Sequence, residues 1–164
     1  MNAEWRVECG EWSTLAEQRK AACRLLGQMV GRPVSVEHDG AGAPLLADEP
    51  DLHISVSHCR KAVAVAMCDE GMVGIDVECR RKVSDGLAVR VCTDEELASV
   101  RASDDPTMAF LRLWTRKEAV LKMRGTGIKG FGSMVGALVA GGCTVRDVDT
   151  GSDDVVAAVA VKAL

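Results

Sequence analysis

The sequence predicts an α+β protein built from two comparable halves, residues 1–85 and 86–164. The order of its segments leads to this class. A helical pattern followed by short strand patterns occupies the first half, and helices followed by strands recur in the second. No internal repeat is detectable in the sequence itself, so we expect any duplication at the level of architecture.

The first half begins with a predicted helix over Thr14–Val30, where apolar residues recur at helical spacing. Ser13 or Thr14 can cap its first turn, and the glycine and proline that follow end it. A short strand over Pro33–Glu37 is expected next. The glycines and proline of His38–Asp51 then predict a loop.

Three strands in close succession complete the first half: Leu52–Ser57, Ala62–Met67 and Met72–Glu78. The first alternates, the second is a run of alanine and valine, and the third is apolar before it turns acidic. Asp69–Gly71 separates the last two strands as a hairpin turn would. We therefore expect these two strands to form a hairpin.

The second half contains the most strongly marked helix of the chain, which starts at Asp105-Pro106 and runs to about Met123. Before it, Ser84–Val91 predicts a short helix or a loop. A capping box from Thr93 to Glu96 starts a further helix. Three strands are expected after the long helix: Gly132–Val139, Cys143–Val148 and Val155–Val161.

The composition excludes several classes of protein. A net charge of -4 argues against general nucleic-acid binding, which needs a basic field. The seven cysteines contain no C-x-x-C pair, so free thiols in a reducing compartment are favoured over a zinc site or a disulfide framework. Glu4, Arg6 and Glu8 stand where a secretory peptide needs an apolar core. We therefore expect a cytoplasmic protein without a targeting or membrane-spanning segment.

Four residues form two candidate sites for a metal ion and a phosphate. Asp76 and Glu78 are two apart on a predicted strand, so they share a face, and a hard cation such as Mg²⁺ would relieve their repulsion. A strand end that reaches solvent explains them as well. Glu118 and Lys122 are four apart on a predicted helix and therefore neighbours. A surface ion pair is the simpler explanation of that pair.

Two further segments could bind phosphate. Ser57 and His58 end a predicted strand and could donate hydrogen bonds. A serine hydrolase is disfavoured, because adjacent strand residues point oppositely and no G-x-S-x-G pattern surrounds them. Gly125–Ile128 indicates a plain helix C-cap when taken alone. Basic residues cluster at 80–82 and at 112–129, where they suit an anionic ligand, an acidic partner or a solvated helix face.

In this order the segments resemble the 4'-phosphopantetheinyl transferase superfamily. The motifs are S-x-S-H ending at His58, G-I-D-x-E ending at Glu78, W-[ST]-x-K-E-A-x-x-K ending at Lys122, and G-x-G-I ending at Ile128. The resemblance implies the fold of that family, with two pseudo-duplicated α+β halves packed as an intramolecular pseudo-dimer. It further implies an active site between the halves and a monomeric chain.

The resemblance also implies a reaction. Such a protein transfers the 4'-phosphopantetheine moiety of coenzyme A to a serine of an apo acyl or peptidyl carrier protein, a holo-acyl-carrier-protein synthase activity. The reaction depends on Mg²⁺, releases 3',5'-ADP and serves fatty-acid, polyketide or nonribosomal-peptide biosynthesis. The carrier is not specified by the sequence, and neither nucleic acid nor a membrane is expected as a partner.

Roles for individual residues follow from the same resemblance. Asp76, Glu78 and Glu118 would be the magnesium ligands. Glu118 and Lys122 would be catalytic, the first by accepting the serine proton directly or through water and the second by stabilising charge on the phosphates. The residues expected to contact coenzyme A are Arg24, Ser57, His58, Lys117 and Lys122.

Two features depart from the larger, surfactin-synthetase-activating type of the family. Ala43 stands where that type usually has a lysine, and the chain begins close to its first helix. Both bear on the affinity for coenzyme A more than on the chemistry. Two alternatives stay open: a metal-dependent phosphoesterase that uses the same carboxylates, and a non-catalytic module that binds coenzyme A or a carrier.

Overall fold

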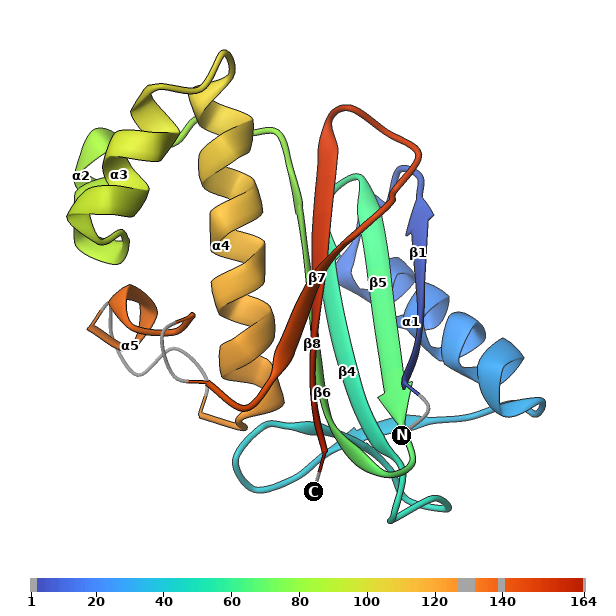
Figure 1. Cartoon of the computed structure of the whole chain (residues 1–164). Helices are drawn as coiled ribbons and strands as arrows, with labels where there is room; N and C mark the ends of the chain where they lie inside the picture. Colours follow the sequence, from blue (N-terminus) through green and yellow to red (C-terminus); the bar gives the residue numbers. More distant parts are fainter. Residues whose placement is uncertain (1–2, 127–131, 139–140, 164) are drawn as a thin grey trace.

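The protein has the mixed α and β structure that the sequence predicts, and the computed structural model describes residues 3–126, 132–138 and 141–163. The described strands form two three-stranded antiparallel sheets and one two-stranded sheet. Figure 1 shows the strands in the middle of the molecule, with helix α1 on one side of them and helix α4 on the other. None of the described helices is both long and apolar enough to cross a membrane.

The first sheet has β5 in its centre, between β1 and β4, and its strands are β1 (Ala3–Cys9), β4 (His53–Cys59) and β5 (Ala62–Cys68). Helix α1 (Leu15–Val30) packs on this sheet through Leu25 and Leu26, which share a core with Val63 and Val65. Thr14 caps the helix with a full capping box, which confirms one of the two predicted caps.

A small two-stranded sheet follows α1. Its strands are β2 (Val36–His38) and β3 (Pro44–Leu46), which pair antiparallel. The prediction of an unbroken loop over His38–Asp51 is therefore wrong in part. Asp39 accepts hydrogen bonds from the backbone N–H groups of Ala41 and Ala43, and this short Asx turn brings the second strand back onto the first.

The second three-stranded sheet has β8 in its centre, and its strands are β6 (Gly71–Cys79), β7 (Thr144–Val148) and β8 (Val155–Ala163). Helix α4 (Pro106–Met123) crosses this sheet, and Asp105 caps it as predicted. Ala119 and Val120 of the helix share a core with Ala158 and Ala160 of β8. Small residues on the facing strand allow the helix to approach the sheet closely.

Gly74 fixes the distance between α4 and β6. A Cβ atom at this position would overlap the carbonyl oxygen of Ala119 and the backbone nitrogen of Met123. These two backbone atoms flank the turn of α4 that contains Lys122. The glycine of the G-I-D-x-E motif therefore has a packing reason: it lets the long helix lie against the strand that holds Asp76.

Strands β4 and β6 lie side by side although they belong to different sheets. The Ser55 hydroxyl accepts a hydrogen bond from the Ile75 N–H at 3.0 Å, and the Ser57 hydroxyl accepts one from the Val77 N–H at 3.3 Å. Residue numbers rise together along the two strands, so their alignment is parallel. The serine side chains thus replace a backbone ladder and join the two sheets.

The remaining helices are α2 (Asp85–Val91), α3 (Asp94–Arg101) and α5 (Gly132–Val135). The first two confirm the predictions for Ser84–Val91 and for the capping box that starts at Thr93. Their buried residues form a core with the first half of α4, and that core includes Phe110 and Leu111. Figure 1 shows α2 and α3 beside one end of α4.

Three predictions of secondary structure are wrong. Strand β1 was not expected, although Trp5 and Val7 alternate with charged residues and pack against the core. No hairpin forms around Asp69–Gly71, because β6 pairs with β8 and not with β5. In place of the strand predicted over Gly132–Val139 there is a short helix that buries Met134, and residue 139 lies outside the described part of the chain.

The two three-stranded sheets have the same strand order. In each, the last strand along the chain lies in the centre, with the first strand on one side and the middle strand on the other. Each has a long helix between its first and middle strands, α1 in one and α4 in the other. The division at residue 85 stays a prediction; β6, which precedes that residue, pairs with β8, which follows it.

Candidate functional site

Asp76 lies at the centre of the candidate site. It is 6% exposed and occupies β6 between the two residues that bond to the serines of β4. One carboxylate oxygen accepts hydrogen bonds from the Ser57 hydroxyl and from the Lys122 ammonium group, both at 2.8 Å. The other oxygen is buried without a hydrogen-bond partner among the described residues. A buried carboxylate oxygen without a partner is costly, so this atom marks a place where a ligand is needed.

Glu118 faces the same region from helix α4. It is 7% exposed, and its Oε1 atom is also buried without a hydrogen-bond partner among the described residues. Burial and, after it, the negative charge of Asp76 raise the pKa of Glu118 to about 7, against the opposing effect of Lys122. The two carboxylates therefore lie within electrostatic reach of each other. The sequence brings them together through Gly74, which seats the helix on the strand.

Lys122 links the acidic residues to the strands beside them. Its ammonium group donates to Asp76, to the carbonyl oxygen of Ile75 at 3.1 Å and to that of Val56 at 3.5 Å. The i, i+4 spacing predicts that Lys122 pairs with Glu118, and no ion pair between these two is present. Lys122 instead binds across the helix–strand contact, where it compensates the charge of Asp76.

Glu78 is in the expected place but is engaged elsewhere. Both of its carboxylate oxygens accept hydrogen bonds from Arg81, at 3.1 and 3.2 Å. The Arg81 guanidinium also lies 5.9 Å from the ring centroid of Trp114. The Glu78 carboxylate is therefore held in a bidentate ion pair with Arg81. Its side chain nevertheless lies on the same face of β6 as that of Asp76.

Asp76, Glu78 and Glu118 are the candidate ligands for a metal ion. In the described part of the chain no group of three or more His, Cys, Asp or Glu side chains is arranged to hold a metal ion. The oxygens of Asp76 and Glu118 that lack partners nevertheless fit a hard cation, which prefers oxygen ligands and would compensate both charges. Glu78 can join them only after its carboxylate leaves Arg81.

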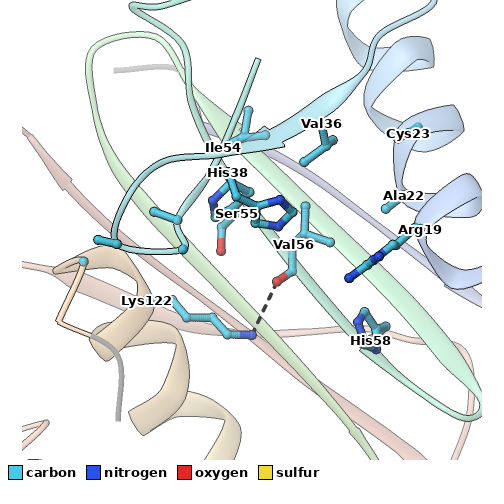
Figure 2. Close-up of a pocket in the computed structure, with 15 residues that line it drawn as sticks. Arg19, Ala22, Cys23, Val36, His38, Ile54, Ser55, Val56, His58 and Lys122 are labelled. Carbon is cyan, nitrogen blue, oxygen red and sulfur yellow. Dashed lines mark hydrogen bonds between the residues drawn. The ribbon is translucent and has the colours of Figure 1, made fainter. Parts of the chain in front are cut away.

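A cavity of about 380 Å³ opens beside Lys122, between α1, the β2–β3 sheet, β4 and the end of α4. Figure 2 shows Lys122 and Arg19 extending toward it from opposite sides, with His58 below Arg19. The lining also includes three residues of the β2–β3 turn, Gly42, Ala43 and Pro44. Positive charge from two helices thus converges on one cavity, which suits an anionic ligand.

His58 contributes to this cavity from the end of β4. Burial lowers the pKa of His58, and the positive charges of Lys122 and Arg19 lower it further. These effects place the imidazole in a cationic environment. An anion bound in the cavity would oppose them and favour the protonated ring.

Ser57 differs from His58 in its surroundings. Its side chain is buried, and its hydroxyl is used twice inside the protein, as a donor to Asp76 and as an acceptor from β6. Ser55, not Ser57, lines the cavity. The structure therefore brings Ser57 to the carboxylate of Asp76 and His58 to the cavity.

Two residues expected to contact coenzyme A lie apart from the cavity. Lys117 is 0% exposed, and its ammonium group donates to Glu96 at 2.6 Å and to the carbonyl oxygen of Val91 at 2.7 Å. Arg24 pairs with Glu8 of β1 at 2.6 Å. Neither lines the cavity. The family resemblance implied that Lys117 binds phosphate, and the charge pattern of a helix does not by itself distinguish its buried face from its exposed face.

Arg19 is a residue that sequence reasoning missed. It lies on α1 five positions before Arg24, lines the cavity and affects the pKa of His58. The helical period could have indicated Arg19, because Arg19 and Arg24 are about one and a half turns apart and their side chains therefore point in different directions. His38 of β2 also lines the cavity, and it was not among the candidate residues predicted from the sequence.

Much of the positive charge that the sequence suggested for an acidic partner is neutralised by ion pairs. Arg80 pairs with Asp105 and Asp154, and Arg116 pairs with Asp147. Lys117 is buried, as described above. Docking of an acidic partner on these clusters stays a prediction.

The comparisons with known proteins agree with the geometry. The model of the 4'-phosphopantetheinyl transferase superfamily matches residues 72–154, which contain Asp76, Glu78, Glu118 and Lys122. This match covers half of the chain. The chain therefore belongs to the 4'-phosphopantetheinyl transferase superfamily, which confirms the resemblance in its motifs.

Individual relatives match over a similar length. The chain is 34% identical over 89 residues to 4'-phosphopantetheinyl transferase Sfp of Bacillus subtilis strain 168, a match that covers 53% of this chain and 39% of the relative. It is 39% identical over 88 residues to 4'-phosphopantetheinyl transferase AcpT of Escherichia coli K12, covering 51% of this chain and 45% of the relative. The matched part thus spans less than half of each of these relatives.

Proposed function

We propose that this chain transfers the 4'-phosphopantetheine moiety of coenzyme A to a serine of an apo acyl or peptidyl carrier protein. One observation carries the proposal: Asp76 and Glu118 each keep a buried oxygen that has no partner within the described part of the chain, beside Lys122 and at the edge of a cationic cavity. Two unsatisfied acids next to an anion-binding cavity suit a reaction in which a cation bridges protein carboxylates and phosphate.

Asp76 and Glu118 would hold Mg²⁺, and Glu78 would join them once released from Arg81. When bound, the cation would supply charge neutralisation for the phosphate groups. Lys122 would stabilise negative charge on the leaving 3',5'-ADP, because its ammonium group lies between the acids and the cavity. Its bonds to two backbone carbonyls hold it in that position.

The proton of the carrier serine has to be accepted as its oxygen attacks the β-phosphorus of coenzyme A. Glu118 is the proposed acceptor, directly or through a water molecule. Burial raises the pKa of Glu118 to about 7, so its carboxylate is a stronger base than an exposed glutamate in the metal-free protein. A bound cation would lower this basicity, which favours transfer through water.

The cavity would hold the nucleotide end of coenzyme A. Arg19, His58 and Lys122 surround it with positive or protonatable groups, while Val36 and Ile54 supply apolar surface. The 3'-phosphate would bind beside His58 and Arg19. Arg19 thereby compensates for Ala43, which lines the same cavity at the position where a lysine is common in the larger type of this family.

The proposed architecture is an intramolecular pseudo-dimer of two β-α-β-β units. The identical strand order of the two three-stranded sheets and the matching positions of α1 and α4 support it. This order favours a junction between β5 and β6 over one at residue 85. The candidate site then lies where the units meet, along β4 and β6, and a cytoplasmic monomer is the form we propose.

The decisive experiment is incubation of the protein with Mg²⁺, coenzyme A and a panel of apo carrier proteins, followed by intact-mass measurement. Transfer adds about 340 Da to a carrier serine. Asp76→Ala and Glu118→Ala should abolish the gain while the far-ultraviolet circular dichroism spectrum stays unchanged. Release of 3',5'-ADP without carrier modification would favour a hydrolase. Coenzyme A binding without either reaction would favour a binding module.

A further inference from the structure

Strands β4 and β6 bring two cysteines together at the ends that lie beside the candidate site. Cys59 is the last residue of β4, and Cys79 is the last residue of β6. Both are partly buried free thiols that pack against the same core. Neither takes part in the proposed reaction, so their pairing calls for a separate account.

The register of the two strands predicts that these thiols meet. Each serine hydroxyl of β4 that accepts a hydrogen bond from β6 bonds to the residue 20 positions further along the chain. Alternate residues of a strand point the same way, so Cys59 points toward β6 as the two serines do. Cys79 lies 20 positions after Cys59 and is therefore its neighbour across the strands.

The side-chain interactions agree with this register. The two thiols lie within hydrogen-bonding reach of each other. Two residues before each cysteine, the Ser57 side chain reaches the backbone of β6 through its Cβ and Oγ atoms alone. This limits the separation of the two backbones there to roughly 6 Å, which is the Cα spacing that a disulfide spans. This spacing is compatible with a disulfide between the two sulfur atoms.

A small oxidant can reach the pair. Cys59 lines a second cavity, of about 590 Å³, together with Trp12, Gln18 and Arg60. Burial raises the pKa of the Cys59 thiol to about 12, so this thiol keeps its proton at neutral pH. Either sulfur can react first with the oxidant, and the other then closes the disulfide.

We propose that Cys59 and Cys79 form a redox-active dithiol that a hydroperoxide closes to a disulfide between β4 and β6. One of the two cysteine sulfurs attacks the peroxide oxygen, the O–O bond breaks, and an alcohol or water leaves with the thiol proton as that cysteine becomes a sulfenic acid. The sulfur of the other cysteine then attacks the sulfenic acid sulfur, and the hydroxyl leaves with the proton of the attacking thiol as water. Two thiols lose two electrons and the peroxide gains them.

The bond would join the two strands directly after His58 and Glu78. It would form a covalent continuation of the serine contacts that already align these strands. In a reducing compartment a thiol reductant reopens it, so the disulfide is a transient modification and not part of the folding framework. The inference does not depend on the proposed transferase activity, because it concerns the thiols alone.

The test uses the full chain, reduced and then treated with hydrogen peroxide before the remaining thiols are alkylated. Closure lowers the intact mass by about 2 Da and leaves two thiols fewer to alkylate. Tryptic digestion without reductant should give a cross-linked peptide pair, with fragmentation locating the bond at Cys79 and not at Cys68, which lies on the same peptide. Dithiothreitol should reverse the change.

Two variants serve as matched controls. Cys79→Ser should abolish closure, whereas Cys9→Ser, which removes an exposed thiol elsewhere, should leave it unchanged. The wild-type peptide map needs no variant to fold. A disulfide between other cysteines, or full alkylation of Cys59 and Cys79 after peroxide treatment, would overturn the proposal.

Discussion

Glu118→Gln should change how the stability of the metal-free protein depends on pH. The Glu118 side chain is buried beside Asp76, and no residue that the structure describes forms a hydrogen bond with one of its oxygens. Burial and the neighbouring carboxylate raise the pKa of Glu118 from 4.5 to about 7. A glutamine keeps the shape of the side chain and removes the titration, so any difference between the two proteins reports on this one group.

The sign and size of the effect follow from linkage. Between pH 4.5 and about 7 the folded protein keeps the Glu118 proton, whereas the unfolded chain releases it. The stabilisation is therefore fully present below pH 4.5 and is lost as the pH rises through about 7. The total loss in the free energy of unfolding is about 3 kcal/mol. Effects of other groups, including His58, occur in both proteins and cancel in the comparison.

The assay is urea denaturation of the wild type and Glu118→Gln at pH 5 and pH 8 in the presence of a chelator. Relative to the wild type, the variant should gain about 3 kcal/mol between these two pH values. Mg²⁺ at pH 8 should stabilise the wild type more than the variant. Parallel pH profiles for the two proteins would refute the burial argument for Glu118.

Three further substitutions, with Arg24→Ala as a control, test the fold and the cavity. Gly74→Ala should lower the free energy of unfolding by about 3 kcal/mol in a denaturation experiment and abolish transfer, because the added Cβ atom displaces α4. Lys117→Met should also cost about 3 kcal/mol, since it leaves a partly buried carboxylate unpaired, but should leave the KM for coenzyme A within about twofold. Arg19→Ala should raise that KM about tenfold through loss of a phosphate contact, whereas Arg24→Ala, on the same helix but outside the cavity, should leave it unchanged. Equal effects of the two arginine variants in steady-state kinetics would contradict the assignment of the cavity.

The sequence predicts most of the elements because their local signals agree with their tertiary roles. The capping box at Thr93 and the cap at Asp105 both form where expected, since a helix start is specified by a few neighbouring residues. The strands β5 and β8, which lie at the centres of the two three-stranded sheets, were expected as strands for a similar reason. Buried alanine and valine runs such as Ala62–Cys68 have few alternatives to a central strand.

Partners between strands could not be predicted in the same way. The three residues Asp69–Gly71 are compatible with a hairpin, yet β6 pairs with a strand that lies about half the chain further on. Helix α4 packs on β6 as well, and Gly74 leaves the room for this contact. A local turn signal contains no information about a helix some 40 residues away.

For the candidate site too, the positions of the residues could be predicted from the sequence, whereas their interaction partners could not. The positions of Asp76, Glu118 and Lys122 follow from strand and helix periods once the family motifs are recognised. Their actual partners do not: Lys122 pairs with Asp76 across elements and not with Glu118 on its own helix. Spacing identifies which residues can be neighbours on an element, whereas burial between elements decides which charges are compensated.

The serines of β4 explain why the fold and the site cannot be separated. Ser55 and Ser57 accept backbone hydrogen bonds that would otherwise be missing where the two sheets meet. The same Ser57 hydroxyl donates to Asp76 and so fixes the orientation of the carboxylate. A change at this serine would therefore alter sheet joining and carboxylate position together. The S-x-S-H and G-I-D-x-E motifs are thus two sides of one contact, which accounts physically for their occurrence as a pair.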